Sequence, residues 1–464
     1  MPIPQHDAIE VSDTPPAPTR PQPLAHAPGQ APLCHSFEQG FEQALISFLQ
    51  GAVAIPSISG QEKPLVEYVA AWCEEQGFKI DLFQTDEKQL ADHALAARKH
   101  IPLANRPTLV VSLDGSAPGA TIMFNAHSDV VRPGDCTQWS HLPWSGDIVD
   151  GRLFGRGACD AKGALAAGLG AMLWIKQKHG SDFSGRIALE LIPGEEDCVD
   201  LGTLTSIHRG YRADAAIVLE PTDSVPRCAA RGGLRFEIIA AGEAVHGTVK
   251  WLGRDAIAML RSVLSALDKL ETRFSREDTD ELFAFYPLMR PITVDHIAGG
   301  TWQGMVCDRA LCSGYFELCP GDNVEVWARH FTASLQSLLR SEGIASEHIG
   351  VAFPEQYNGF RTEQTSSICK AAARVLESVD ASWADAPAGA APWRGFNSGC
   401  EGGLRAAMHA TPTLVWGPGS LDQAHRCDEY VSVHDVLKCS RMMAEVAAEF
   451  LKGQAARESH GEKN

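Results

Sequence analysis

Residues 121–129 read TIMFNAHSD, an apolar run that leads directly into His127, Ser128 and Asp129. A short apolar run of this kind is typical of a strand buried in a parallel sheet. Three distant runs also lead into possible metal ligands: Ile187–Ile192 into Glu195 and Glu196, Ala215–Leu219 into Glu220, and Thr413–Trp416 into His425. Because ligands bind beyond the carboxyl ends of strands in open α/β sheets, we expect these side chains to meet at one edge.

Helical patterns alternate with these strands. Helical spacing of apolar residues begins after Phe37, and the longest helical stretch is Gly163–Lys178. Thr108–Ser112 is a further apolar run. Strands alternating with helices predict an α/β domain whose mostly parallel sheet carries helices on both faces.

The middle of the chain has a different order of elements. It predicts strand, helix, strand, strand, helix, strand, over Leu234–Ala240, Asp255–Phe274, Ile292–His296, Ala310–Leu318, Val324–Leu339 and Ile349–Phe353. This is the split βαβ pattern of a small α+β sandwich. We therefore expect an inserted domain at residues 229–358, between two parts of the larger domain at residues 37–228 and 359–464. Residues 1–36, rich in Pro and Ala, are expected to form a disordered tail.

Composition excludes several classes of protein. The 464 residues carry a formal net charge of -18, which disfavours nucleic acid and anionic membranes as partners. The 13 cysteines include no CxxC pair, so neither a disulfide framework nor a zinc ribbon is expected. There is no basic segment followed by an apolar one at the N-terminus, and no apolar run of membrane-spanning length. We expect a cytoplasmic protein with reduced thiols.

The residue types at the expected sheet edge suit zinc, which prefers imidazole nitrogen and carboxylate oxygen. Asp160, in the stretch GRGACDAKG ahead of the long helix, is a fifth candidate ligand. An aspartate can bridge two ions with one oxygen on each. Two ions about 3.5–4 Å apart can hold both an attacking water and a carbonyl oxygen.

Two acidic positions beside the ligands have expected roles of their own. Asp129 lies two residues after His127, so it can face the same side of the strand and orient the imidazole. In the pair Glu195-Glu196, one carboxylate can bind metal while its neighbour moves protons. Taken singly, each motif also fits a bland interpretation: an incidental His-x-Asp, a solvated Glu pair, or a Glu-Pro that ends a strand.

Taken together, the motifs resemble the zinc aminoacylase and carboxypeptidase family that includes acetylornithine deacetylase and succinyl-diaminopimelate desuccinylase. The carrying stretches are NAHSDVV, WSGDIVDGRLFGRGACDAKGALAA, PGEED, VLEPTD, AVHGTVKWLGRDA and GPGSLDQAHRCDEYV. The resemblance covers roughly residues 40–450. It implies a zinc-exopeptidase-like catalytic domain and a ferredoxin-like lid through which two copies form a homodimer.

The resemblance also implies roles for individual residues. The metal ligands for two Zn²⁺ would be His127, Asp160, Glu196, Glu220 and His425, with Asp160 bridging; Co²⁺ or Mn²⁺ would fit the same ligands. Asp129 would orient His127, and Glu195 would be the general base. His246 would reach a neighbouring subunit's site and stabilise the oxyanion; the alternative is an ordinary surface histidine of the lid.

Some positions depart from the family pattern. Many relatives have an Asn and an Arg in the lid that bind a substrate carboxylate, whereas this chain has Gln303 and Gly304 near the first position and Glu317 near the second. Glu401 stands where relatives often carry Asp. These departures leave recognition of a substrate carboxylate in doubt.

The function that the sequence predicts is metal-dependent hydrolysis of a small amide, with an N-acylated amino acid or related amide as the substrate. A dipeptidase or carboxypeptidase of the same family is the nearest alternative. A hydrolase of another C–N bond also fits, as does a catalytically inactive relative that binds a ligand. The presence of Glu195 and of all five ligands argues against the inactive relative.

Overall fold

The computed structural model describes residues 37–85, 90, 105–197, 201–277, 279–379 and 393–459. The chain divides into two units, Met1–Gly40 and Phe41–Asn464, and the sheets described below belong to the second. The expected tail at residues 1–36 lies outside the described residues.

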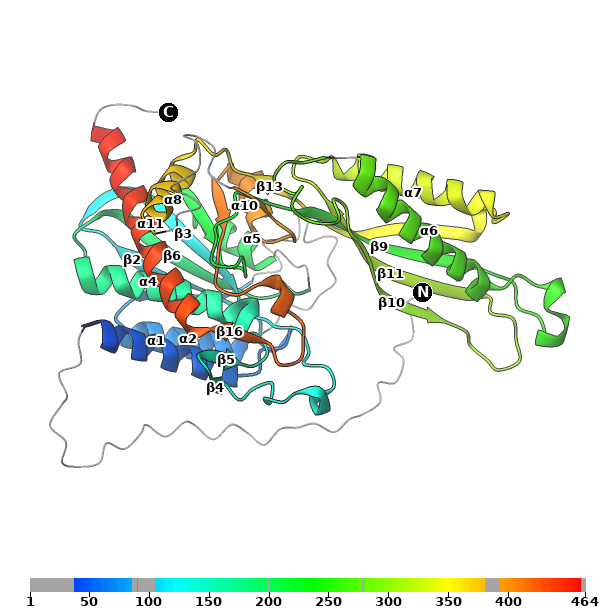
Figure 1. The fold of residues 1–464 in the computed structure, drawn as a ribbon, viewed down its shortest axis with the longest axis horizontal. Helices are drawn as coiled ribbons and strands as arrows, with labels where there is room; N and C mark the ends of the chain where they lie inside the picture. The colour runs from blue at the N-terminus through cyan, green and yellow to red at the C-terminus, as the bar shows by residue number, and fades with distance from the viewer. Residues whose placement is uncertain are drawn as a thin grey trace. The chain divides into compact units, whose positions relative to one another are not determined.

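A six-stranded sheet forms the centre of the larger domain (Figure 1). Its order is β1 (Lys79–Gln84), β2 (Pro107–Asp114), β6 (Ser184–Ile192), β3 (Ala117–His127), β7 (Ala215–Val218) and β15 (Thr413–Val415). The last four strands run parallel, while β1 and β2 are antiparallel to their neighbours. The sequence prediction of a mostly parallel sheet is confirmed, and each strand expected from an apolar run is present.

Helices cover both faces of this sheet. One hydrophobic core joins the sheet to α1 (Phe37–Ala54), α2 (Lys63–Glu75), α4 (Gly163–His179), α8 (Ser367–Glu377) and α11 (Val433–Ser459). A separate cluster joins α5 (Leu201–His208) to α10 (Gly402–His409). Successive residues of a strand face opposite sides, so a strand without polar alternation needs cover on both.

Helix α4 lies at the centre of this packing because small residues let its neighbours approach. A Cβ added to Gly168 would lie 2.5 Å from Leu219, and one added to Gly170 would lie 2.6 Å from Ser440 of α11. Residues 158–179 are long and apolar enough to cross a membrane, with a mean hydropathy of 1.2. Their most apolar window is entirely buried inside the fold, as in the core helix of a globular domain.

The smaller domain is a four-stranded antiparallel sheet with two helices. It consists of β9 (Gly232–Ala241), α6 (Ala256–Glu277), β10 (Ile292–Gly299), β11 (Arg309–Leu318), α7 (Val324–Ser341) and β12 (Ile349–Tyr357). Spatial order is β10-β11-β9-β12, which is the ferredoxin-like arrangement predicted from the sequence. On α6, buried residues recur at helical spacing and pack with α7 and the sheet around one core. We call this domain the lid.

Two small sheets hold the loops around the strand ends. One has the order β13 (Phe360–Arg361), β8 (Ala229–Ala230) and β14 (Gly395–Phe396). The other has the order β16 (Tyr430–Ser432), β5 (Arg152–Phe154) and β4 (Ile148–Val149). The pairing of β16 with β5 brings the segment that follows His425 beside the segment that precedes Asp160.

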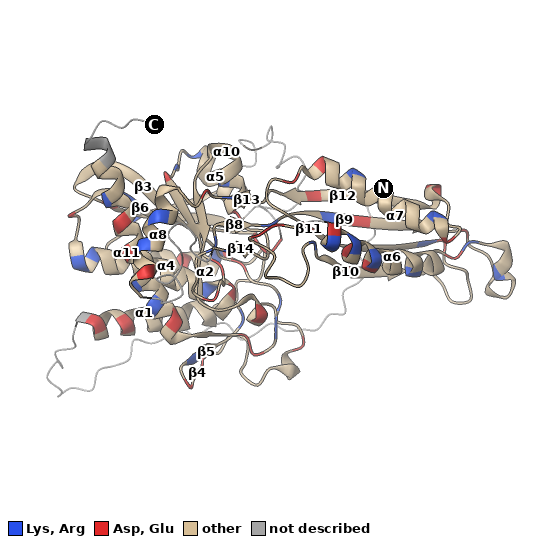
Figure 2. Ribbon diagram, turned by 45° about the horizontal axis from the view of Figure 1, so that its top comes forward, with Lys and Arg blue, Asp and Glu red and all other residues tan. Residues whose placement is uncertain are grey.

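Charged residues of both signs occur along helices such as α6 and α11 (Figure 2). This mixture is what a solvated helix face requires. The 11 cysteines in the described ranges are all free.

Candidate active site

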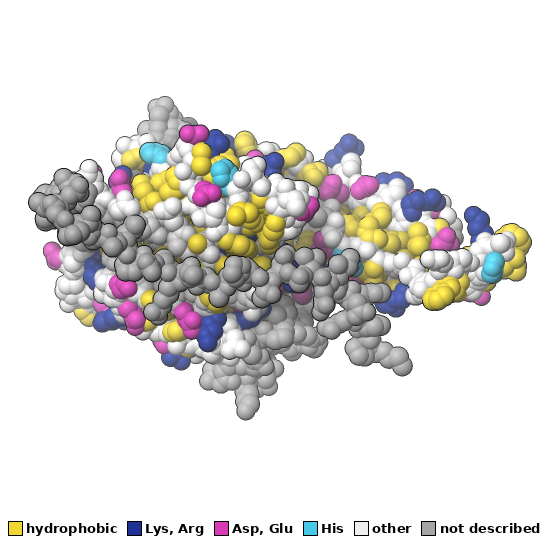
Figure 3. All heavy atoms as spheres, turned by 90° about the horizontal axis from the view of Figure 1, so that it is seen from below, with side chains coloured by type: hydrophobic (Ala, Val, Ile, Leu, Met, Phe, Trp, Pro, Cys, Tyr) yellow, Lys and Arg dark blue, Asp and Glu magenta, His cyan; other side chains and the backbone are white. Residues whose placement is uncertain are grey.

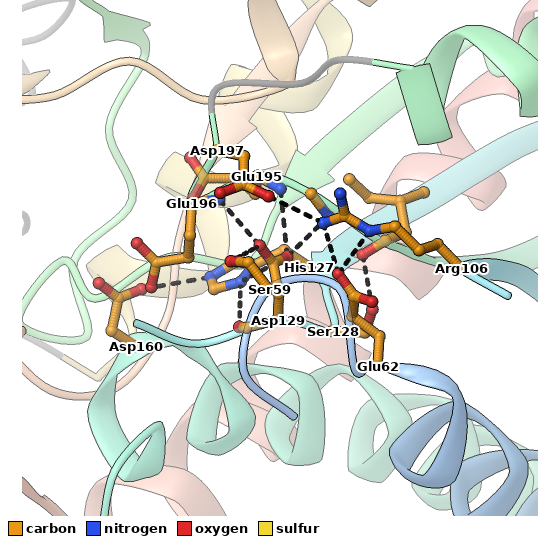
Figure 4. Close-up of polar contacts among 12 residues, drawn as sticks. Ser59, Glu62, Arg106, His127, Ser128, Asp129, Asp160, Glu195, Glu196 and Asp197 are labelled. Carbon is orange, nitrogen blue, oxygen red and sulfur yellow. Dashed lines mark hydrogen bonds and ion pairs between the residues drawn. The ribbon is translucent and has the colours of Figure 1, made fainter. Parts of the chain in front are cut away.

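Four parallel strands deliver the expected side chains to one edge of the sheet. His127 is the last residue of β3, and Glu196 lies in the turn that follows β6. Glu220 follows β7, and His425 lies beyond β15 after the short helix η6 (Leu421–Gln423). Because β6, β3, β7 and β15 are neighbours and parallel, their carboxyl ends meet. Figure 4 shows His127, Asp160 and Glu196 together.

The five expected metal ligands form two groups that share Asp160. In the first, Nε2 of His127 lies 3.2 Å from Oδ1 of Asp160 and 3.8 Å from a carboxylate oxygen of Glu220. In the second, Nε2 of His425 lies 3.4 Å from Oδ2 of Asp160 and 3.0 Å from Oε2 of Glu196. Asp160 therefore turns one oxygen toward each group, as a bridging ligand must.

The donor set fits a pair of divalent cations. Oε1 of Glu196 is buried and has no hydrogen-bond partner, so it is available to a cation. Burial and neighbouring carboxylates raise the pKa values of Glu195, Glu196 and Glu220, with burial the largest cause. Bound cations would oppose these shifts, because positive charge favours the ionised carboxylates.

The imidazole of His127 is oriented by Asp129, but through its main chain. Nδ1 of His127 lies 2.9 Å from the carbonyl oxygen of Asp129 and 3.8 Å from the nearer carboxylate oxygen. We expected the carboxylate to make this contact. A neutral imidazole that donates from Nδ1 to this carbonyl leaves Nε2 for a metal.

The carboxylate of Asp129 instead holds the turn that carries the two glutamates. It accepts hydrogen bonds from the main-chain N–H groups of Gly194, Glu195 and Glu196 at 2.9 to 3.1 Å, and from the hydroxyl of Ser59 at 2.8 Å (Figure 4). Asp129 thus links the end of β3 to the turn after β6 and fixes the main-chain positions of Glu195 and Glu196.

Glu195 and Glu196 face different neighbours. A carboxylate oxygen of Glu195 lies within 4.8 Å of carboxylate oxygens of Glu220 and Glu401. Glu196 faces Asp160 and His425. Glu195 also lines the pocket, so its carboxylate is placed to exchange a proton with a group bound there.

Glu429, which the sequence prediction missed, holds the loop that carries Asp160. Its buried carboxylate accepts hydrogen bonds from the main-chain N–H groups of Gly157, Cys159 and Asp160 at 2.9 to 3.1 Å. Arg156 donates to the same carboxylate at 2.5 Å. Glu429 stands in the quoted stretch QAHRCDEYV, but its spacing carries no ligand pattern, so only the fold reveals this contact.

One pocket of about 440 Å³ opens onto the two groups. Residues of the larger domain line it, and so do Tyr315, Glu317 and Tyr357 from lid strands β11 and β12. Glu401, which stands where relatives often carry Asp, is part of the lining, whereas Gln303 and Gly304 are not among the described lining residues.

His246 lies apart from this pocket in its own chain. It precedes helix η4 (Gly247–Leu252), its side chain is exposed, and Nδ1 lies 2.8 Å from the hydroxyl of Thr248. It is not among the described lining residues of the pocket.

Several known proteins are similar to this chain in sequence. The sequence profile of peptidase family M20/M25/M40 matches residues 123–449. An acetylornithine deacetylase of Myxococcus xanthus is 28% identical over 414 residues, which cover 89% of this chain and 98% of that protein. A succinyl-diaminopimelate desuccinylase of Methylorubrum populi is 30% identical over 236 residues, 49% of this chain and 57% of that protein.

Solved structures show the same fold. The dipeptidase Dug1p of Saccharomyces cerevisiae matches with a TM-score of 0.69 at 14% identity, over 90% of this chain and 99% of that chain. Human carnosine dipeptidase 1 matches with a TM-score of 0.65 at 16% identity, over 89% and 97% of the two chains.

Proposed function

The chain belongs to peptidase family M20/M25/M40, and from that membership we propose that it removes the acyl group from an N-acylated amino acid or a related small amide. Members of this family are metal-dependent hydrolases of amide bonds, and this chain is an enzyme of that kind. The observation that carries the proposal is the position of Asp160 between the two groups of ligands.

Each side chain has a defined task in this reaction. Two cations would be held by the five ligands, with Asp160 between them and His127, Glu220, Glu196 and His425 around them. Zn²⁺ is the proposed metal, and Co²⁺ or Mn²⁺ would fit the same donors. When bound, the cations supply positive charge that acidifies a water molecule and polarises the scissile carbonyl.

Glu195 then performs the proton transfers. Its carboxylate faces the pocket beside Glu220, where it takes a proton from the attacking water and later gives it to the leaving nitrogen. Asp129 holds the main chain of Glu195 in place during both transfers. The lid strands that line the pocket exclude bulk water around the substrate.

The acyl amino acid is favoured as the substrate because the match to an acetylornithine deacetylase covers nearly the full length of both chains. Hydrolysis of a dipeptide uses the same chemistry and is the second candidate, since the fold is shared with dipeptidases. Hydrolysis of another C–N bond remains the third, on the basis of the unusual lid position Glu317.

We also propose a cytoplasmic homodimer formed through the lid, with neither nucleic acid nor membrane as a partner. Large apolar side chains are exposed near His246. Two of them, Trp251 and Leu252, follow His246 closely in the sequence. The others are Met305, which forms an isolated β-bridge with His246, and the neighbouring Trp302. Figure 3 shows hydrophobic side chains on the surface of the lid, at the right of the view. Covering them with a second copy would bring His246 toward the partner's site.

A substrate screen tests the proposed function. The metal-loaded enzyme would be assayed with N-acetyl, N-succinyl and N-formyl amino acids and with dipeptides, beside the Glu195→Gln variant. We expect at least one acylated amino acid to be hydrolysed, and we expect Glu195→Gln to keep its metal while turnover falls at least ~100-fold. If none of these amides were hydrolysed, the proposal would be refuted. If Glu195→Gln kept the wild-type turnover, Glu195 would have no part in the mechanism.

A further inference from the structure

A carboxylate of the lid lines the active-site pocket. Glu317 lies near the end of β11, whereas the five expected metal ligands come from the larger domain. Cations held by those ligands would neutralise the acidic groups at the sheet edge. The negative charge of Glu317 would then remain available to bind a positively charged group in the pocket.

The structure holds Glu317 in place from one side only. The hydroxyl of Tyr357 donates a hydrogen bond to Oε1 of Glu317 at 2.7 Å. Oε2 is buried and has no hydrogen-bond partner. A buried carboxylate oxygen without a donor is costly for a protein, and because Glu317 lines the pocket, a ligand bound there can supply the donor.

The neighbouring cation is already engaged elsewhere. Arg231 acts electrostatically on Glu317, yet its guanidinium donates to Asn397 at 2.8 and 3.0 Å and to the carbonyl of Met289 at 2.6 Å. No ion pair joins Arg231 to Glu317 within 4.0 Å among the described residues. The described lining of the pocket contains neither Lys nor Arg.

A glycine lets Tyr357 reach across the sheet. Glu317 and Tyr357 both pair with Gly233, one from each neighbouring strand. A Cβ on Gly233 would lie 2.3 Å from the Tyr357 ring, and one on Gly399 would lie 2.2 Å from it. The ring therefore occupies the space that side chains at these two positions would fill.

Aromatic side chains line the same pocket as this carboxylate. Tyr315 is two residues before Glu317 on β11 and so faces the same side, and Phe396 also lines the pocket. A carboxylate beside aromatic faces is the chemistry that binds an organic ammonium group, through an ion pair and cation–π contacts. The same carboxylate repels a substrate carboxylate.

We propose that Glu317, Tyr315 and Tyr357 form a subsite that binds a primary ammonium group of the substrate. This inference rests on the proposed amide hydrolysis and narrows its substrate class to cationic amides. The ammonium can belong to the leaving amine, as in an acylated diamino acid, or to the acyl part, as in a dipeptide with a free amino terminus.

Matched pairs of substrates distinguish these two sources. Nα-acetyl-lysine and Nα-acetyl-norleucine differ in the ammonium of the leaving amine, and alanyl-leucine and propionyl-leucine differ in the ammonium of the acyl part. We expect kcat/KM of the metal-loaded enzyme to favour the cationic member of at least one pair by about tenfold or more. Equal rates within both pairs would overturn the inference while leaving the amidohydrolase proposal intact.

The Glu317→Gln variant tests the residue itself. We expect it to lower the preference for the cationic substrate to less than about threefold, mainly by raising the KM of the cationic substrate. Glu237→Gln is the matched control, because Glu237 is exposed on β9 of the same sheet. An unchanged preference in Glu317→Gln would overturn the inference.

Two further measurements keep the test decisive. If Glu317→Gln fails to fold, Tyr357→Phe keeps the ring and removes the hydroxyl that holds Glu317, and an undiminished preference would overturn the inference. If no amide is hydrolysed, calorimetry of the metal-loaded protein with pentylamine and pentanol replaces the assay. Tighter binding of the amine, lost in Glu317→Gln, would support the subsite, and equal binding would refute it.

Discussion

Glu195 and Glu196 show how adjacent side chains come to differ in role. The turn after β6 directs Glu196 toward His425 and Glu195 toward Glu220 and Glu401. The sequence alone predicted that two neighbouring carboxylates would divide the work, because neighbours cannot easily face the same ion. It could not predict that the main chain of Asp129 would orient His127 while the carboxylate held the turn, since the sequence pattern is the same for both arrangements.

At Glu317 the structure predicts a dependence of stability on pH. Burial raises the pKa of this carboxyl to about 7, while Tyr357 and Arg231 act in the opposite direction. A carboxyl whose pKa is raised by folding binds more protons in the folded state than in the unfolded state. The free energy of unfolding therefore falls as pH rises from about 4.5 through 7.

Replacing Glu317 by Gln removes this dependence. We expect Glu317→Gln to be more stable than the wild type at pH 8 by about 1–3 kcal/mol, and the two to converge toward pH 4.5, in denaturant unfolding of the metal-loaded proteins. Glu237→Gln should show no such pH-dependent difference. A Glu317→Gln variant that is less stable at pH 8 would mean that the carboxylate is satisfied within the protein, which would also weaken the proposed subsite.

At the scale of elements, the sequence predicted those features that continuous local patterns of residues specify, namely the strands and the edge of the sheet where the ligands meet. Apolar runs such as Thr121–Ala126 predicted the parallel strands, and the ligands that follow them predicted the edge where they meet. The contacts that hold the loops were not predictable. Glu429 and Asp160 are distant in the chain, and only the pairing of β16 with β5 brings their segments together.

The loop that carries Asp160 should depend on Glu429. In Glu429→Gln one acceptor oxygen is lost and Arg156 loses its charged partner, so we expect the loop to shift and metal affinity to fall about 10–100-fold. Chelator competition with the purified protein measures this affinity.

The adjacent Asp428→Asn is the control for this prediction. Asp428 is half-buried and accepts hydrogen bonds from the main-chain N–H groups of Ser140 and His141, neither of which is an expected ligand. It should keep the wild-type affinity. Equal affinities of Glu429→Gln and wild type would show that Asp160 is positioned without Glu429.

At the scale of the whole molecule, the sequence predicted both sheets but not how the lid contributes to the pocket. The order of strands and helices was sufficient for the ferredoxin-like arrangement. That the last residues of β11 and β12 would line the pocket depends on the packing of the two domains, which no local pattern encodes. The exposed position of His246 is a further result of tertiary structure.

A subunit-mixing experiment tests the proposed dimer and His246 together. His246→Ala and Glu195→Gln should each be poorly active alone, because each lacks one part of the site. In a mixed dimer, the chain with intact Glu195 would receive His246 from its partner, so mixing should restore part of the activity. Activity of the mixture equal to the mean of the two separate variants would contradict the role of His246 across the dimer.

Metal analysis of the purified protein tests the central claim most directly. After incubation with zinc and removal of free ions, we expect about two ions per chain, because Asp160 joins two groups of ligands. Asp160→Ala should lose both ions, whereas Asp422→Ala, in the nearby helix η6, should keep them. A wild-type chain that binds no metal, or an Asp160→Ala variant that still binds both ions, would contradict the account.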